Sequence, residues 1–329
     1  MFALFLLLFL EPFGFAQVPG AAVFPEGEDG WEHLSLDEHL NVVYALQRSG
    51  RYEAASKRLF FLLHREEYQD SRLFIQFEYA KNAEYQEEYQ IALSVYDNLF
   101  LEKLPSDLKL NVLYRYSIML MELNDPKGAI KIAKKIRRSR ILSSSDRRAV
   151  SLILGTAQLQ AGKKKKGIRR IQKTFGKLVS PQEHAWLQAR AKMALAEELL
   201  FQAEQIELFT VEEIEDSLKI RANLIIQAER QVQSIIALNE PEYALSGLSR
   251  VADSMLVLYD DLLASQPPSE FTKEQKELYK EAMDEKADFL QEKALSYYST
   301  ALRYANQIEW SGKIRGELQA KYDALQQEI

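Results

Sequence analysis

The chain has 329 residues and a formal net charge of -6, and its 47% hydrophobic and 27% charged residues are typical of a folded globular protein rather than a disordered chain. It contains no cysteine, which excludes disulfides, thiolate metal sites, iron–sulfur clusters and a thiol nucleophile. Four histidines, of which none are spaced as zinc ligands, leave little for metal or acid–base chemistry, so we expect no metal and no cofactor. With only 13 Gly and 9 Pro, the composition favours a helical binding protein.

The first sixteen residues are expected to be a cleaved signal peptide. The apolar run from Phe2 to Leu10 is too short to span a bilayer, which takes about 20 helical residues. Gly14-Phe15-Ala16 has the small-x-small pattern of a cleavage site, and cleavage after Ala22 is the alternative. No Lys or Arg precedes the apolar run, so either the true start of the chain lies upstream or the segment is a buried N-terminal helix. Export predicts a periplasmic protein in which residues 17–34 form a flexible segment and no transmembrane span follows.

From Ser35 onward the sequence predicts an all-α fold, because no alternating strand pattern occurs. Capping boxes at Ser35, Thr210 and Thr272 indicate helix starts. Pro181 and Pro241 follow a polar residue and are suited to the first position of a helix. In the second half of the chain we expect four helices, the first three of them long, at Val211–Leu238, Glu242–Ala264, Lys273–Gln307 and Ser311–Gln327.

A repeat runs through the first half of the chain. Its markers are four small residues, one in every second expected helix, and they are spaced 37, 37 and 38 residues apart. Small residues also stand twelve positions before the later markers, and the expected turns lie five positions before each marker. Paired small residues allow two helices to approach closely, so the unit is read as helix–turn–helix. The markers are Ala55, Ala92, Ala129 and Gly167; their small partners are Ala80, Ser117 and Gly155; and the turns are at Gly50, Glu87, Asn124 and Gly162.

These small residues resemble the eighth and twentieth positions of the tetratricopeptide repeat (TPR) family, and Tyr96 resembles the aromatic residue of its second helix. The repeat here is longer than the family's unit, and the consensus tryptophan is absent. The resemblance covers Asp37 to about Leu200 and implies a solenoid of helical hairpins. We therefore expect TPR-like repeats over residues 35–203 and a TPR-like region of longer helices over 211–329. An irregular helical bundle is the alternative.

The second half also resembles periplasmic TPR proteins of the adventurous gliding motility machinery of deltaproteobacteria. This resemblance implies a structural part of an envelope-spanning complex, not a catalyst. The residues that carry it are Ala228-Glu229, Pro241-Glu242-Tyr243-Ala244, Pro267-Pro268, Glu285-Lys286-Ala287 and Glu292-Lys293-Ala294.

Charge is distributed unevenly along the chain. Residues 126–180 contain 17 Lys or Arg and a single acid, Asp146, whereas residues 197–329 contain 26 acids and 13 bases. Such asymmetry is typical of a partner surface or of internal charge pairing. Helical spacing predicts basic stripes that merge into one patch, formed by Lys127, Lys131, Lys134, Arg138, Lys163, Lys164, Lys165, Lys166, Arg169, Arg170, Lys173 and Lys177.

Four interpretations of this basic patch remain open: a solvated face, a docking site for an acidic protein, a site for anionic lipid or cell-wall polymer, and a nucleic-acid site. Nucleic acid is disfavoured, because Phe175 is the only aromatic residue in the basic segment and base stacking needs aromatic residues.

Catalytic motifs are missing from the sequence. Gly162 to Gly167 has the glycines of a phosphate-binding loop, but Ile168-Arg169 follow where Lys and Ser or Thr are needed, so an inter-helix turn is expected. Tyr79, Tyr85, Tyr89, Tyr96 and the Tyr297-Tyr298 pair are read as packing residues or as the lining of a peptide groove. The sequence thus predicts a non-catalytic scaffold that binds protein partners. An exported helical enzyme acting on cell-wall glycan and a cytoplasmic TPR adaptor are the alternatives.

Overall fold

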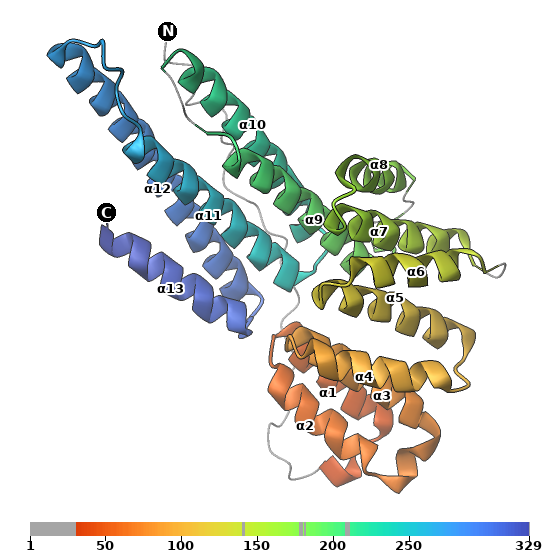
Figure 1. The fold of residues 1–329 in the computed structure, drawn as a ribbon. Coiled ribbons are helices and arrows are strands. Elements are labelled where there is room, and N and C mark those ends of the chain that lie inside the picture. Colours follow the sequence, from red (N-terminus) through yellow and green to blue (C-terminus); the bar gives the residue numbers. More distant parts are fainter. Residues whose placement is uncertain (1–30, 140–141, 178–179, 181, 208–210, 329) are drawn as a thin grey trace. The chain divides into compact units, whose positions relative to one another are not determined.

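The computed structural model describes residues 31–139, 142–177, 180, 182–207 and 211–328. Within these ranges the secondary structure is helical, without strands, so the all-α prediction is confirmed (Figure 1). The described chain divides into two compact units. The N-terminal unit contains the residues up to Ala191 together with Trp310–Gly312, and the C-terminal unit contains Lys192–Glu309 and the residues from Lys313 onward. The expected signal peptide and the Thr210 capping position lie outside the described residues.

Helices of the N-terminal unit pack in chain order, each against the next, from α1 to α8. Two short 3-10 segments, Trp31–His33 and Glu66–Ser71, accompany them. The Ser35 capping box at the start of α1 is confirmed. The helices are α1 (Leu36–Arg48), α2 (Tyr52–Leu63), α3 (Arg72–Tyr85), α4 (Tyr89–Leu101), α5 (Ser106–Glu122), α6 (Pro126–Arg137), α7 (Ser144–Gln160), α8 (Lys164–Phe175) and the start of α9 (Ala185–Glu204).

The four predicted turns adopt the same backbone conformation. Gly50, Glu87, Asn124 and Gly162 have φ values of 73, 63, 60 and 75°, in the left-handed region. In each turn the next residue donates its backbone N–H to a carbonyl five positions back, at 2.7 to 2.9 Å. This is the Schellman arrangement, which satisfies carbonyls at the end of a helix and reverses the chain. The turn positions expected from the repeat are therefore confirmed.

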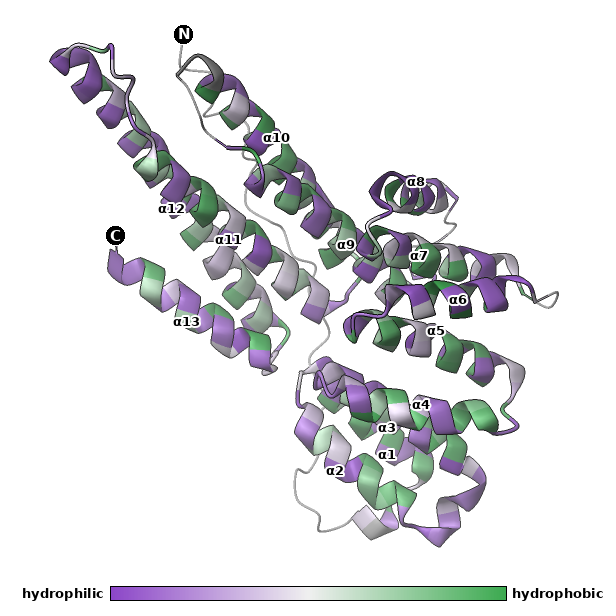
Figure 2. Ribbon diagram, in the orientation of Figure 1, coloured by the Kyte–Doolittle hydropathy of each residue, from purple (hydrophilic) through white to green (hydrophobic). Residues whose placement is uncertain are grey.

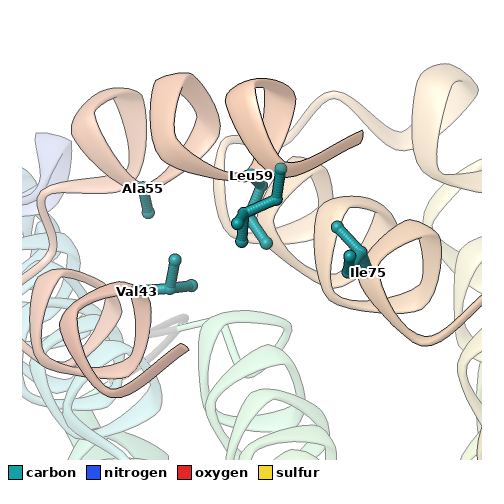
Figure 3. Close-up of a cluster of buried hydrophobic side chains, with 5 residues drawn as sticks. Val43, Ala55, Leu59 and Ile75 are labelled. Atoms are coloured by element: carbon teal, nitrogen blue, oxygen red, sulfur yellow. The ribbon is translucent and has the colours of Figure 1, made fainter. Parts of the chain in front are cut away.

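Small residues lie where paired helices meet. A cluster of Val43, Ala55, Leu59, Leu62 and Ile75 fills the space between α1, α2 and α3 (Figure 3). The seven small residues that the repeat singles out for packing are all buried: Ala55, Ala80, Ala92, Ser117, Ala129, Gly155 and Gly167.

Helices α7 and α8 approach each other closely at two of these positions, Gly155 and Gly167. A Cβ added to Gly167 would lie 2.7 Å from the backbone oxygen of Gly155 and 2.7 Å from the backbone nitrogen of Leu159. A Cβ added to Gly155 would lie 2.6 Å from a side-chain carbon of Ile171. The two glycines therefore let the backbones of this hairpin come into direct contact.

Longer helices form the C-terminal unit: α10 (Val211–Ile236), α11 (Pro241–Ala264), α12 (Lys273–Gln307) and α13 (Lys313–Glu328), together with the end of α9. Their bounds lie within two residues of the four predicted ones. Pro241 at the first position of α11 and the Thr272 capping box of α12 are confirmed. Among the described residues, no helix is both long enough and apolar enough to cross a membrane.

One predicted helix start is wrong. Helix α9 begins at Ala185, four residues after the expected position at Pro181. His184 has a φ of 51°, outside the right-handed helical region, so no helix can run through it from Pro181. The His184 ring lies edge-on against Tyr114 of α5, with 5.8 Å between ring centroids, and this tertiary contact accompanies the late start.

We predict that Gly167→Ala lowers the free energy of unfolding by about 1–3 kcal/mol, because the added methyl group meets backbone atoms that cannot move aside. Urea denaturation followed by far-UV circular dichroism measures the effect. Gly176→Ala is the matched control, since a Cβ there has no neighbour closer than 3.8 Å. Equal urea midpoints for the two variants would contradict direct backbone contact between α7 and α8.

Candidate functional site

The basic residues of α6 and α8 face the solvent because the other side of each helix is buried. In α6, Ala129, Ile130, Ala133 and Ile136 are buried against the neighbouring helices. In α8, Gly167, Ile171 and Thr174 are buried. Because residues three or four apart share one side of a helix, burying these positions leaves the lysines and arginines on the opposite side. In Figure 2, most of the α8 ribbon has the colour of hydrophilic residues.

Almost every predicted residue of the patch is exposed to solvent. Arg170 differs, because it is half-buried and its Nε donates to Oε1 of Gln158 at 3.2 Å. Lys135 and Arg137 are also exposed, although the three- and four-residue spacing used for the prediction passes over them. We define the basic face as the exposed set Lys127, Lys131, Lys134, Lys135, Arg137, Arg138, Lys163, Lys164, Lys165, Lys166, Arg169, Lys173 and Lys177.

Positive charges on α6 and α8 lie close enough to repel one another. Burial lowers the pKa of the Arg170 guanidinium, and repulsion by Arg137 of α6 lowers it further. Asp146, the single acid of residues 126–180, is occupied elsewhere: it accepts hydrogen bonds from Ser143 at 3.0 Å and from the Tyr114 hydroxyl at 3.0 Å. Leaving Lys164 aside, no ion pair joins the basic face to an acid within the described part of the chain. The face therefore carries a concentrated positive charge that its own side chains do not neutralise.

Elsewhere in the N-terminal unit, charged groups are buried in pairs. Glu84 of α3 accepts a hydrogen bond from Arg115 of α5 at 2.7 Å and another from the Tyr96 hydroxyl. The Arg115 guanidinium also lies over the Trp186 ring, 4.5 Å from its centroid. Burial raises the pKa of the Glu84 carboxyl, while Arg115 and Tyr96 act in the opposite direction. This network links α3, α4, α5 and α9, so we assign it a structural role.

A second buried acid, Glu229 of α10, has a similar setting. Burial raises its pKa, whereas hydrogen bonds from Tyr297 and Gln233 lower it. An open surface depression lies between α12 and α13, but its lining contains neither Glu84 nor Glu229 and no other carboxylate. The lining residues are Ser299, Leu302, Arg303, Asn306, Gln307, Gln319 and Tyr322.

Most of the tyrosines singled out in the sequence take part in packing. Tyr96 is fully buried, Tyr79 packs against the cluster of Figure 3, and Tyr85 stacks on Tyr52 with ring centroids 5.2 Å apart. Tyr297 and Tyr298 of α12 are buried, and the Tyr298 hydroxyl donates to Asp253 of α11 at 2.6 Å. These positions support inter-helix packing rather than the lining of a peptide groove.

Comparison with known proteins adds no relative: no protein-family model matches the chain, and no curated protein is similar to it. Within the part of the chain that the structure describes, no three His, Asp or Glu residues are grouped so that they could hold a metal ion. The basic face is therefore the candidate functional site.

We predict that Glu84→Gln lowers the free energy of unfolding by about 3–5 kcal/mol, because it leaves the Arg115 guanidinium buried without a counter-charge. The double variant Glu84→Gln with Arg115→Met removes both charges and should recover most of the loss. Urea denaturation measures the free energy of unfolding of both variants. The control is Glu53→Gln, which changes an exposed residue of α2. A double variant at least as unstable as Glu84→Gln would contradict the structural role.

Proposed function

We propose that this chain is a non-catalytic scaffold for protein–protein interactions, placed in a periplasmic complex of the cell envelope. The observation that carries the proposal is the basic face, where α6 and α8 expose lysines and arginines to solvent and Arg137 of α6 lies near enough to Arg170 of α8 to lower the pKa of Arg170. Complementary charge accelerates and orients docking, so a face of this kind suits an acidic protein partner. Most residues of the basic face are lysines. The charged group of a lysine lies at the end of a flexible side chain, so it can adjust to partners of different shape.

A TPR-like solenoid is part of the proposal. Support comes from the shared turn geometry at intervals of 37 to 38 residues and from the buried small residues of the hairpins. Repeats of this type bury an apolar core between neighbours and display extended outer surfaces, which is the usual design of a binding scaffold. The resemblance of the second half to envelope motility proteins suggests gliding motility as the process served.

The remaining charged and aromatic groups support a role without catalysis. The two buried acids with raised pKa values are both hydrogen-bonded to neighbouring side chains, and most of the tyrosines pack between helices. An acid or base that transfers protons to a substrate needs an open approach and a matched pKa. In the proposed scaffold, the buried acids and tyrosines stabilise the fold, and the exposed basic face binds the partner.

We predict that a photo-crosslinking amino acid at Gln172, an exposed position of α8, captures a protein in the native cells. The same group at Gln90 of α4 is exposed but lies on a helix outside the basic face, and it should capture none. Crosslinking at Gln172 should fall at least tenfold in the basic-face variant, which carries Lys163→Glu, Lys166→Glu and Arg169→Glu. Lack of any adduct at Gln172, or adducts that persist in this variant, would count against a docking role.

A separate experiment tests export by determining the N-terminal residue of the protein purified from its native cells. We predict that mass spectrometry finds the mature chain starting at Gln17, as expected for cleavage after Ala16. A start at Val23 would indicate the alternative site after Ala22 and would still support export. An uncleaved N-terminus would contradict the periplasmic location and favour a cytoplasmic adaptor, without affecting the docking test.

A further inference from the structure

We propose that the basic face binds the acidic stripe of α12 in a second copy of this chain, so that copies associate head to tail. This inference rests on the proposed docking function and names one occupant of the docking surface. Its physical basis is a match of charge, exposure and spacing between two surfaces that belong to different units of the protein.

The acidic stripe occupies the N-terminal half of α12. Its six members follow one another at three- and four-residue steps, so at about 100° per residue they fall within an arc of about 80° on the helix. The first and last are separated by about 27 Å along the helix axis. All six side chains are exposed: Glu274, Glu277, Glu281, Glu285, Asp288 and Glu292.

Within the described ranges, no ion pair joins any of the six carboxylates of the stripe to a Lys or Arg. Burial lowers the pKa of the neighbouring Lys286, whereas the charge of Glu285 raises it. The lysines of this part of α12 lie outside the 80° arc: Lys276, Lys286 and Lys293 are half-buried, whereas Lys273 and Lys280 are exposed beside the stripe. The opposite side of the helix is apolar and packs against the C-terminal unit through buried Met283, Ala287 and Leu290. Helix α12 therefore presents a straight row of negative charge to solvent.

The basic face presents rows of positive charge. Lys127, Lys131, Lys134 and Arg138 follow α6 at three- and four-residue steps, over about 17 Å. On α8, Lys163, Lys166 and Lys173 lie on one side over about 15 Å. The row on α6 offers one charge per helical turn of about 5.4 Å, as does the acidic stripe, whereas the row on α8 has a turn without a charge between Lys166 and Lys173. Helix α6 packed beside α12 of a second copy can therefore pair opposite charges turn after turn, without either helix changing its conformation.

A protein surface fits the basic face better than a membrane or a nucleic acid. No large apolar side chain on α6 or α8 is exposed that could anchor the face among lipid chains. The only aromatic on these two helices is Phe175, which is half-buried, so stacking on bases has no platform. A second copy supplies an opposing row of matched pitch and opposite sign. The net charge of +16 in residues 126–180 is also close in size to the -13 of residues 197–329.

Head-to-tail contact has a consequence for assembly. Each copy has one basic face and one acidic stripe, so binding one partner leaves the other surface free for a further copy. The association should therefore grow with protein concentration. It should also weaken with salt, because the screening length falls from about 10 Å at 0.1 M to about 3 Å at 1 M.

The test is sedimentation velocity of the full chain between about 1 and 100 µM, at about 0.1 M and about 1 M salt. The wild type should form larger species as its concentration rises at low salt, and should be monomeric at high salt. Two charge-reversal variants are compared with it. The first is the basic-face variant defined above, and the second is the acidic-stripe variant with Glu277→Lys, Glu281→Lys and Glu285→Lys.

Each variant alone pairs a wild-type surface with one in which three charges are reversed, so its association constant should fall at least tenfold. An equimolar mixture of the two should recover association, because the two wild-type surfaces meet each other and the reversed residues of one variant meet reversed residues of opposite sign in the other. A control variant reverses three exposed lysines outside the basic face and should associate like the wild type. Its substitutions are Lys57→Glu, Lys103→Glu and Lys109→Glu.

Three outcomes would overturn the inference. The first is a wild type that stays monomeric at every concentration and at both salt levels. The second is a mixture of variants that fails to recover association although each variant shows the wild-type circular dichroism spectrum. The third is binding to vesicles of anionic phospholipid, lost in the basic-face variant, without self-association, which would assign the face to a membrane. A non-self adduct at Gln172 without self-association would overturn this inference alone and leave the scaffold proposal standing.

Discussion

Close backbone approach between paired helices is the constraint on which the N-terminal unit depends. At the α7–α8 hairpin the approach is so tight that one additional carbon at Gly167 would collide with main-chain atoms of Gly155 and Leu159. The left-handed turns hold each hairpin at its end, and the small residues determine which side of each helix faces its neighbour. Once that side is buried, the orientation of all other side chains follows. The basic residues of α6 and those of α8 are therefore exposed as a consequence of core packing.

The protein uses charge in two distinct ways. Buried ionic groups such as Glu84 and Arg115 occur with their partners, because an uncompensated charge in the interior would cost several kcal/mol. Charges on the basic face and on the acidic stripe of α12 are exposed, where water solvates them. Solvated charges of one sign in a row repel one another, and a partner of opposite sign relieves that repulsion. This difference is the reason for assigning stability to the buried pairs and docking to the exposed rows.

Much of the fold follows from local sequence signals, whereas the tertiary polar contacts do not. The turns at Glu87 and Asn124 were predictable because equal spacing places them in register with Gly50 and Gly162, although neither is glycine. The start of α9 was not predictable, since the conformation of His184 accompanies its contact with Tyr114, seventy positions earlier in the sequence. The pairing of Glu84 with Arg115 likewise joins residues 31 positions apart without a local pattern. Helical spacing identified most of the basic face but could not show that Arg170 turns inward to Gln158.

Chemical labelling of lysines measures the central claim, that the basic face is covered by protein in the native complex. Acetylation rates are compared between the complex isolated from native cells and the purified chain diluted to a monomer. The account predicts at least tenfold protection of Lys131, Lys134, Lys163 and Lys166, with Lys57 and Lys103 labelled at equal rates in both samples. Equal labelling of the basic-face lysines in the complex and the monomer would contradict the account and show that this charged surface is only solvated.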